Sequence, residues 1–122
     1  MSETFTPTAY MKSSCPFCFK VIMFLAEAGL MDKLNIVRIE TENTEELEHY
    51  REKLQALTGK PASFPTIELT PGQFVSDSDE LISYFAEQNG IDPTSLPGLA
   101  YYKANLMPAY IANFKALKAL KQ

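Results

Sequence analysis

The segment 15–18 (Cys-Pro-Phe-Cys) constrains the fold of this chain most, because it contains both of its cysteines. It follows a short apolar run, residues 8–11, and opens a longer amphipathic one. If the second run is a helix, Cys15 lies at its first turn, where unpaired backbone N–H groups and the helix dipole stabilise an anion. Pro16 suits that turn, since it lacks an N–H and its φ angle is already helical. Cys18 then lies on the same face, so a thiolate nucleophile would have a second thiol in reach.

The pattern of apolar residues predicts an α/β fold. Residues 8–11 and 35–39 have the composition of strands, and residues 16–28 between them have helical spacing. A strand–helix–strand start favours a parallel pair with a crossover helix. The resulting order, βαβα and then ββα, predicts a sandwich with a mixed four-stranded sheet. The later elements are a helix from Asn43 to about Leu57, a hairpin of residues 65–69 and 74–75, and a helix that follows residues 76–80 and ends at Gly90.

The chain divides into a domain of residues 1–90 and a linker with a helical extension, residues 91–122. Residues 99–120 are helical in composition. Pro108 is expected to begin a second helix there or to kink a single one. The apolar stripe expected on this helix consists of Tyr110, Phe114 and Leu117.

The net charge of −4 is unevenly distributed. Residues 1–97 carry 7 basic and 15 acidic side chains, whereas residues 98–122 carry four lysines and no acid. An acidic body argues against nucleic-acid binding, which needs a basic surface. The basic tail could dock on its own acidic domain, on a second copy of the chain or on a partner. Its lysines are Lys103, Lys115, Lys118 and Lys121.

Length and composition are those of an ordinary globular domain, with 122 residues and 46% hydrophobic content. No apolar run approaches the roughly 20 residues of a membrane span. Residues 1–7 lack the charged start and apolar centre of a signal peptide, which predicts a cytoplasmic location. In that compartment a lone Cys-x-x-Cys motif is typical of a catalytic or metal-binding site rather than a structural disulfide.

Metal binding and a structural disulfide are the alternatives to redox chemistry. A structural zinc site needs four Cys or His ligands, but the chain has two cysteines and one histidine. That histidine, His49, lies in the middle of an acidic helix and is expected at the surface. A Cys15–Cys18 disulfide would close so short a loop that it would remove little chain entropy. Redox use of the two thiols is therefore the favoured interpretation, with no metal site.

Lys12 and Pro65 are further candidates. Lys12, three residues before Cys15, either lowers the pKa of that thiol or is an ordinary surface lysine. Pro65 starts a strand, where a proline is tolerated. A cis bond before it would turn the backbone of Phe64 toward the thiol, although only about 5–6% of X–Pro bonds are cis.

Four features in this order resemble the glutaredoxins of the thioredoxin-fold superfamily, and also the amino-terminal domain of glutathione transferases. The resemblance spans roughly residues 6–90 and implies a thioredoxin-like βαβ-ββα sandwich. It implies a dithiol glutaredoxin, which reduces protein–glutathione mixed disulfides and other disulfides through Cys15, with Cys18 resolving. The features are the segment 12–18 (Lys-Ser-Ser-Cys-Pro-Phe-Cys), Thr58-Gly59, residues 64–66 (Phe-Pro-Thr) and the polar helix start 77–79.

The resemblance also implies a glutathione site. Lys12 matches the basic residue that meets the glycine carboxylate of glutathione. Phe17 matches the aromatic residue that lines the site. Phe64 and Pro65 match the pair whose backbone binds the cysteinyl part, with the proline cis.

The start of the last helix in the 1–90 domain is implied to hold the γ-glutamyl group. Asp77 and Ser78 resemble the acid–serine pair of transferases, whereas a glutaredoxin-style alignment would pair Ser78 with Asp79. Either register works physically, because a helix N-terminus attracts the glutamyl carboxylate and an acid pairs with its ammonium. Plain N-capping is the alternative role of these residues.

Two features depart from the glutaredoxin pattern. Residues 74–76 (Phe-Val-Ser) stand where a Gly-Gly pair is usual, which is closer to transferases. The tail resembles the start of a transferase's helical domain but is too short to build it, so a truncated transferase-like domain without the hydrophobic substrate pocket is one alternative. The others are a glutathione-ligated iron–sulfur cluster shared by two copies through Cys15, and a partner-docking protein that uses the basic tail.

Overall fold

A four-stranded sheet forms the centre of the computed structural model, which describes residues 5–120. The strand order is β2-β1-β3-β4. β1 pairs in parallel with β2 and antiparallel with β3, which also pairs antiparallel with β4. The mixed sheet predicted from the sequence is confirmed. The strands are β1 (Thr8–Lys12), β2 (Asn35–Ile39), β3 (Thr66–Thr70) and β4 (Gln73–Val75).

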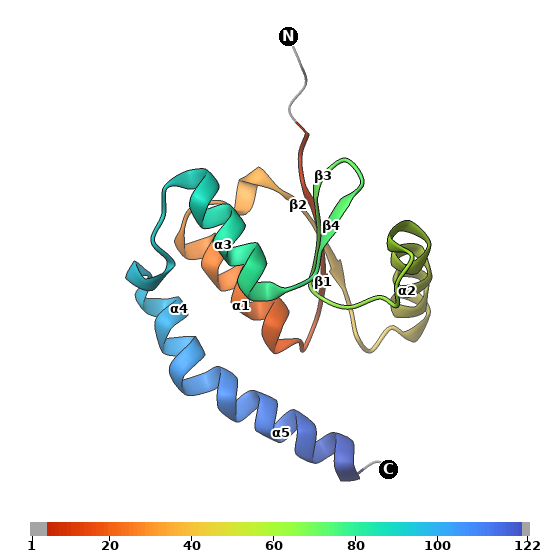
Figure 1. The fold of residues 1–122 in the computed structure, drawn as a ribbon. Coiled ribbons are helices and arrows are strands. Elements are labelled where there is room, and N and C mark those ends of the chain that lie inside the picture. Colours follow the sequence, from red (N-terminus) through yellow and green to blue (C-terminus); the bar gives the residue numbers. More distant parts are fainter. Residues whose placement is uncertain (1–4, 121–122) are drawn as a thin grey trace.

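Helices cover both faces of this sheet (Figure 1). α1 (Pro16–Glu27) and α3 (Ser78–Asn89) pack together on one face, and α2 (Thr44–Thr58) lies alone on the other. The main core lies between the sheet and the α1–α3 pair, where Phe24 and Leu81 are fully buried. The smaller core under α2 consists of Tyr10, Ile39 and Leu54.

Local capping sets the ends of these helices close to where the sequence predicts them. The Asn43 side chain accepts a hydrogen bond from the Glu46 N–H at 3.1 Å at the start of α2. Gly90 ends α3 with a φ of 66°, in the left-handed region that glycine adopts at little cost. Short 3₁₀ turns that the sequence analysis did not anticipate lie at Met31–Lys33 and Pro93–Ser95.

The extension is one continuous helical path with a wide turn in its middle. It consists of α4 (Pro97–Tyr101), a π-helical segment (Tyr102–Leu106) and α5 (Met107–Leu120). In the wide turn the Met107 N–H bonds to the Tyr102 carbonyl, five residues back. Pro108 explains this turn, because in a regular helix its ring would clash with the carbonyl four residues back. Pro108 therefore marks the start of a second helix, but through a π turn rather than a break.

α1 anchors the extension at the end opposite the cysteines. The Glu27 carboxylate accepts hydrogen bonds from the Gly98 N–H at 2.9 Å and the Leu99 N–H at 2.5 Å. A Cβ atom at position 98 would lie 2.8 Å from that carboxylate, so a larger residue there would push the Glu27 side chain aside. Leu99 is buried in the main core, so the first turn of the extension packs as part of the body.

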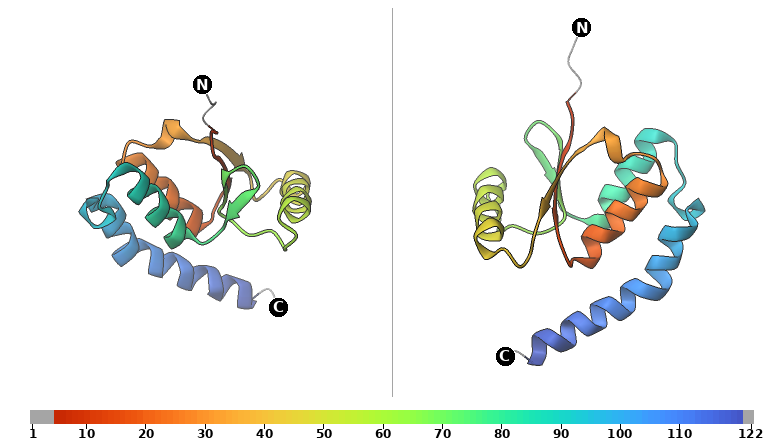
Figure 2. Two further views of the ribbon diagram at one scale, coloured as in Figure 1. Left: turned by 45° about the horizontal axis from the view of Figure 1, so that its top comes forward. Right: turned by 180° about the vertical axis from the view of Figure 1, so that it is seen from behind.

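α5 runs away from the body after its first turns (Figure 2). The expected stripe of Tyr110, Phe114 and Leu117 is 41%, 48% and 60% exposed. Three of the four tail lysines are exposed as well, while Lys121 lies outside the described residues, as do residues 1–4 of the N-terminal segment. Within residues 5–120, no helix is long and apolar enough to cross a bilayer.

Removing the Glu27 carboxylate is expected to loosen the extension. Glu27→Ala leaves the N–H groups of Gly98 and Leu99 without their acceptor, and we expect a loss of about 1–2 kcal/mol in the free energy of unfolding. Thermal unfolding followed by circular dichroism measures it, with Glu52→Ala on the exposed face of α2 as the matched control. Equal midpoints for both variants would contradict the anchoring role.

Candidate functional site

Cys15 and Cys18 lie at the N-terminus of α1, at the surface end of the main core. Cys15 is the N-cap residue, and its sulfur accepts a hydrogen bond from the Cys18 N–H at 3.3 Å. Pro16 follows it in the first turn, which leaves the remaining N–H groups free to face the sulfur. Both cysteines are free thiols, Cys15 half-buried and Cys18 almost fully buried. Only Cys15 is therefore accessible to a large substrate.

The two thiols differ sharply in acidity. The hydrogen bond from the Cys18 side chain, the backbone N–H groups of Cys18 and Phe17 and the charge of Lys12 together lower the pKa of Cys15 to about 6, against the opposing effect of burial. The same hydrogen bond to Cys15 and burial raise the pKa of Cys18. At neutral pH the pair therefore holds one accessible thiolate with a protonated thiol behind it.

Lys12, Phe64 and Pro65 lie beside the thiols. The Phe64–Pro65 peptide bond is cis, and the Phe64 carbonyl oxygen lies 3.8 Å from the Cys15 sulfur, which donates to it only in the thiol form. The Lys12 ammonium lies 5.6 Å from the centroid of the Phe64 ring, and the Lys12 N–H donates to the Cys18 sulfur at 3.4 Å. These three residues thus reach the cysteines from β1 and from the loop before β3.

Phe17 connects the cysteines to the start of α3. Its ring is 42% exposed, and the Lys20 ammonium lies 5.8 Å from the ring centroid. Lys20 is only 4% exposed, and its ammonium forms an ion pair with Asp79 at 2.7 Å. That bond lowers the pKa of the Asp79 carboxyl. Sequence reasoning missed Lys20, although its position four residues before the buried Phe24 was a signal that it faces inward.

Asp77 and Ser78 occupy the first turn of α3. Asp77 is the N-cap residue, and its carboxylate accepts a hydrogen bond from the Glu80 N–H at 3.0 Å. Ser78 is buried, at 8% exposure. Lys20 links this helix start to the segment that holds the cysteines, because its ammonium lies next to both Asp79 and the Phe17 ring.

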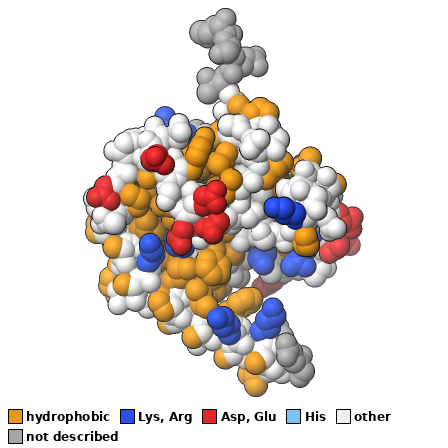
Figure 3. All heavy atoms as spheres, in the orientation of Figure 1, with side chains coloured by type: hydrophobic (Ala, Val, Ile, Leu, Met, Phe, Trp, Pro, Cys, Tyr) orange, Lys and Arg blue, Asp and Glu red, His pale blue; other side chains and the backbone are white. Residues whose placement is uncertain are grey.

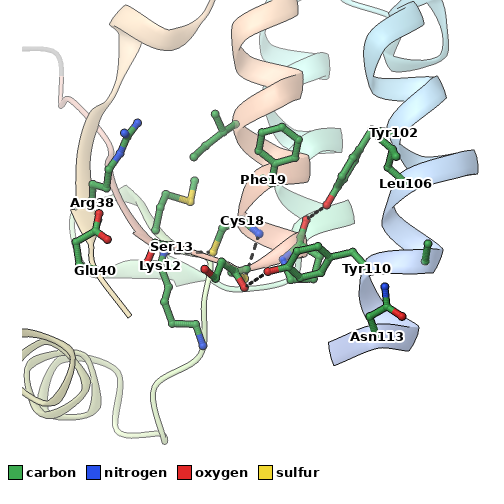
Figure 4. Close-up of a pocket in the computed structure, with 16 residues that line it drawn as sticks. Lys12, Ser13, Cys18, Phe19, Arg38, Glu40, Tyr102, Leu106, Tyr110 and Asn113 are labelled. Carbon is green, nitrogen blue, oxygen red and sulfur yellow. Dashed lines mark hydrogen bonds between the residues drawn. The ribbon is translucent and has the colours of Figure 1, made fainter. Parts of the chain in front are cut away.

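A cavity of about 740 Å³ lies on the other side of the cysteines, between the body and the extension (Figure 4). Cys15, Cys18 and Phe19 form its floor, and the end of β2 contributes Arg38 and Glu40. Figure 3 shows hydrophobic side chains gathered between the body and the projecting helix. The sequence analysis expected the tail to be too short to build a transferase's helical domain, and it did not anticipate that the tail would line a cavity. The extension lines the cavity with Tyr102, Leu106, Ala109, Tyr110 and Asn113.

Two tyrosine hydroxyls join the extension to the segment that holds Cys15. Tyr102 donates to the Pro16 carbonyl and Tyr110 donates to the Ser14 carbonyl, each at 2.8 Å (Figure 4). Burial raises the pKa of the Tyr102 hydroxyl, so it stays a donor. Neither tyrosine was a candidate from the sequence, because the contacts span more than eighty residues.

The described residues, 5–120, contain no cluster of three or more His, Cys, Asp and Glu side chains that could hold a metal ion. His49 is exposed on α2, where it stacks edge-on against Tyr50 with 5.0 Å between the ring centroids. The surface position expected for this histidine is confirmed.

Comparison with solved structures shows which proteins share this fold. Glutaredoxin 2 from Salmonella typhimurium, in complex with glutathione, matches with a TM-score of 0.55 and 13% identity over 84% of this chain and 46% of its own. A glutathione transferase homologue from Sulfitobacter, with bound glutathione, matches with a TM-score of 0.52 and 21% identity over 84% of this chain and 50% of its own. A glutathione S-transferase from the Antarctic clam Laternula elliptica matches with a TM-score of 0.50 and 23% identity over 70% of this chain and 36% of its own. The chain thus spans half or less of the length of these proteins, with which it shares the thioredoxin-type fold.

Sequence comparison identifies the family. No curated protein matches the chain. Residues 14–88 match the family model described as the glutathione S-transferase N-terminal domain, which covers more than half of the chain and extends from the cysteine segment to the end of α3. The chain therefore belongs to the family of the glutathione S-transferase N-terminal domain.

Proposed function

We propose that the protein is a glutathione-dependent thiol–disulfide oxidoreductase that acts on protein–glutathione mixed disulfides and other disulfides. The observation that carries this proposal is the pairing of an accessible Cys15, whose pKa is lowered to about 6, with the protonated thiol of Cys18 behind it. A thiolate is the species that attacks a disulfide, and a pKa just below neutral pH combines ionisation with nucleophilicity.

The reaction is a sequence of exchanges at sulfur. The Cys15 thiolate attacks the glutathione sulfur of a mixed disulfide, the S–S bond breaks, and the substrate protein leaves as a thiolate. A second glutathione thiolate then attacks the glutathione sulfur on Cys15, which yields glutathione disulfide and returns the Cys15 thiolate. For a disulfide that holds no glutathione, the Cys15 thiolate attacks one of its sulfurs, the S–S bond breaks and the substrate stays bound to Cys15 as a mixed disulfide. Cys18 then loses its proton and attacks the Cys15 sulfur, which releases the substrate as a thiolate and leaves a Cys15–Cys18 disulfide. Two glutathione molecules reduce that disulfide.

Glutathione is proposed to lie across the Phe64–Pro65 segment. There its cysteinyl part would meet the Phe64 backbone next to the Cys15 sulfur, since the Phe64 carbonyl oxygen lies 3.8 Å from that sulfur. Phe17 would line the site, since its exposed ring lies in the first turn of α1 between the two cysteines, and Lys12 would hold the glycine carboxylate, since its ammonium lies 5.6 Å from the centroid of the Phe64 ring.

For the γ-glutamyl group, Asp77 and Ser78 are the proposed partners. Because Lys20 already neutralises Asp79, Asp77 is the acid that we assign to the glutamyl ammonium. The glutamyl carboxylate would face the N-terminus of α3, whose dipole favours an anion.

A coupled assay tests the proposed function. Oxidation of NADPH is followed with glutathione, glutathione reductase and a glutathionylated protein as substrate. Turnover that depends on both glutathione and this protein is expected. If folded, fully reduced protein gives no turnover, the proposal fails.

Lys12→Ala is expected to raise the apparent KM for glutathione about tenfold, with a smaller change in the maximal rate. The variant loses a charge-assisted hydrogen bond to the glycine carboxylate, which is worth about 1.5–3 kcal/mol. The measurement is a glutathione titration in the coupled assay, with Lys60→Ala on the loop after α2 as the charge-matched control. Unchanged dependence on glutathione would remove Lys12 from the site.

A second candidate is glutathione transfer to an apolar electrophile. The cavity of about 740 Å³ beside Cys15 favours it, because such a space could hold an organic second substrate. A glutathione-dependent change in the absorbance of an aromatic electrophile, in the absence of any disulfide, would identify this activity. The cluster-binding alternative predicts visible absorbance and dimerisation after anaerobic reconstitution with iron, sulfide and glutathione.

A further inference from the structure

The backbone just before the nucleophile is held in an unfavourable conformation. Ser14 has a φ of 58°, and within residues 5–120 it is the one residue other than glycine with a positive φ. A side chain in this left-handed region costs free energy, so neighbouring contacts must hold it there. Ser14 directly precedes Cys15, and any relaxation of its backbone would move the Cys15 sulfur.

Contacts from two directions fix this turn. On one side, Ser13 bonds to Thr41 through both its backbone and its hydroxyl. On the other side, the Tyr110 hydroxyl donates to the Ser14 carbonyl at 2.8 Å from helix α5. Tyr102 donates to the Pro16 carbonyl, so the two hydroxyls bracket Cys15.

The π turn brings both tyrosines to the same face of the extension. A regular α-helix advances about 100° per residue, so side chains eight positions apart, such as Tyr102 and Tyr110, would differ by about 80°. The π turn takes up one extra residue, which makes this spacing equivalent to seven. Side chains seven positions apart lie on one face. The wide turn that Pro108 imposes is thus also what lets both hydroxyls reach the cysteine segment.

We propose that Tyr110 is a positioning residue for Cys15: its bond to the Ser14 carbonyl holds the left-handed turn and thereby makes helix α5 a determinant of Cys15 reactivity. This inference rests on the proposed function for its biological meaning. Without the Tyr110 hydroxyl the Ser14 turn relaxes, the Cys15 sulfur shifts relative to the Cys18 N–H and thiol, and the thiolate loses stabilisation.

The test is the pH dependence of Cys15 alkylation by iodoacetamide, followed by mass spectrometry, which requires no glutathione turnover. Tyr110→Phe keeps the ring and removes only the hydroxyl. We expect its midpoint to lie above that of the wild type and its rate at pH 6 to fall about threefold to tenfold, with nearly equal rates at pH 9. Tyr101→Phe, which removes a hydroxyl from a tyrosine that is 62% exposed, is the matched control and should keep the wild-type profile.

A rescue separates positioning from a general loss of stability. Glycine adopts a positive φ at little cost, so in a Ser14→Gly background the turn no longer depends on Tyr110. The Tyr110→Phe substitution should then change the alkylation profile far less. An unaltered profile in Tyr110→Phe, or an equal effect in both backgrounds, overturns the inference. If the profiles shift as expected while every variant is inactive with glutathione, the proposed function fails and the positioning role stands.

Discussion

Cys15→Ser is expected to abolish glutathione-dependent disulfide reduction, with a loss of at least about a thousandfold. The serine hydroxyl does not ionise near neutral pH and forms no disulfide, so neither the attack nor the mixed disulfide is available. The fold should tolerate the change, because Cys15 is half-buried at an N-cap position where serine is also favoured. The coupled assay with a glutathionylated protein measures the loss.

The control for Cys15→Ser is its thermal unfolding, which should stay close to that of the wild type. A folded Cys15→Ser protein that retains a tenth or more of the wild-type rate would place the nucleophile elsewhere. A retained rate with an aromatic electrophile, together with lost disulfide reduction, would favour the transferase alternative.

Two substitutions at Cys18 should separate its two roles. Both remove the resolving thiol, so both should abolish the reduction of disulfides that need a second cysteine. Cys18→Ser keeps a donor toward the Cys15 sulfur, whereas Cys18→Ala removes the hydrogen bond that contributes most to lowering the pKa of Cys15. Only the alanine variant should therefore lose activity with protein–glutathione mixed disulfides, a reaction that needs one cysteine.

The size and the pH dependence of that loss follow from ionisation. A thiol with a pKa of about 6 is mostly ionised at pH 7, while one near its ordinary value of about 8.5 is ionised to a few per cent. Since the backbone N–H groups still stabilise the thiolate, we expect Cys18→Ala to be about tenfold slower than Cys18→Ser at pH 7. The difference should vanish above pH 9. Equal rates of the two variants from pH 5 to pH 9 would show that the Cys18 side chain does not lower the pKa of Cys15.

The low pKa of Cys15 also makes the stability of the folded protein depend on pH. A thiol whose pKa is lowered by folding stabilises the folded state fully above its unfolded pKa, and this contribution is lost as the pH falls through about 6. The reduced protein should therefore gain stability as the pH rises from 6 toward 8, provided that Cys15 is present, whereas the raised pKa of Cys18 opposes this gain above about pH 8.5.

Local sequence patterns predicted most of the fold. The strand β1, the capped start of α1 at Cys15 and the hairpin of β3 and β4 each follow from residues within a few positions of one another. The end of α3 at Gly90 is likewise a local signal. The mixed character of the four-stranded sheet then followed from the order of the elements along the chain.

Contacts between distant segments were what the sequence could not provide. The ion pair of Lys20 with Asp79 joins α1 to α3, so the sequence alone does not show which acid Lys20 meets. The cavity depends on the direction of the extension, which Glu27 fixes by binding the start of α4 about seventy residues later. The tyrosine contacts depend in addition on the π turn before Pro108, so they could be recognised only once the path of the helix was known.

The attachment of the extension to both ends of α1 has a consequence for how the molecule opens. Glu27 binds the start of α4 at one end of that helix, and Tyr102 binds the Pro16 carbonyl at the other. Segments joined in this way open as one cooperative unit, so the amides of α1 and α4 should share one free energy of opening in hydrogen exchange. Within residues 5–120, no hydrogen bond joins α5 to the body beyond Tyr110, so the last turns of this helix are expected to fray on their own. Proteolytic trimming after Phe114 would then leave residues 14–18 supported, whereas a cut before Gly98 would release the helices that hold them.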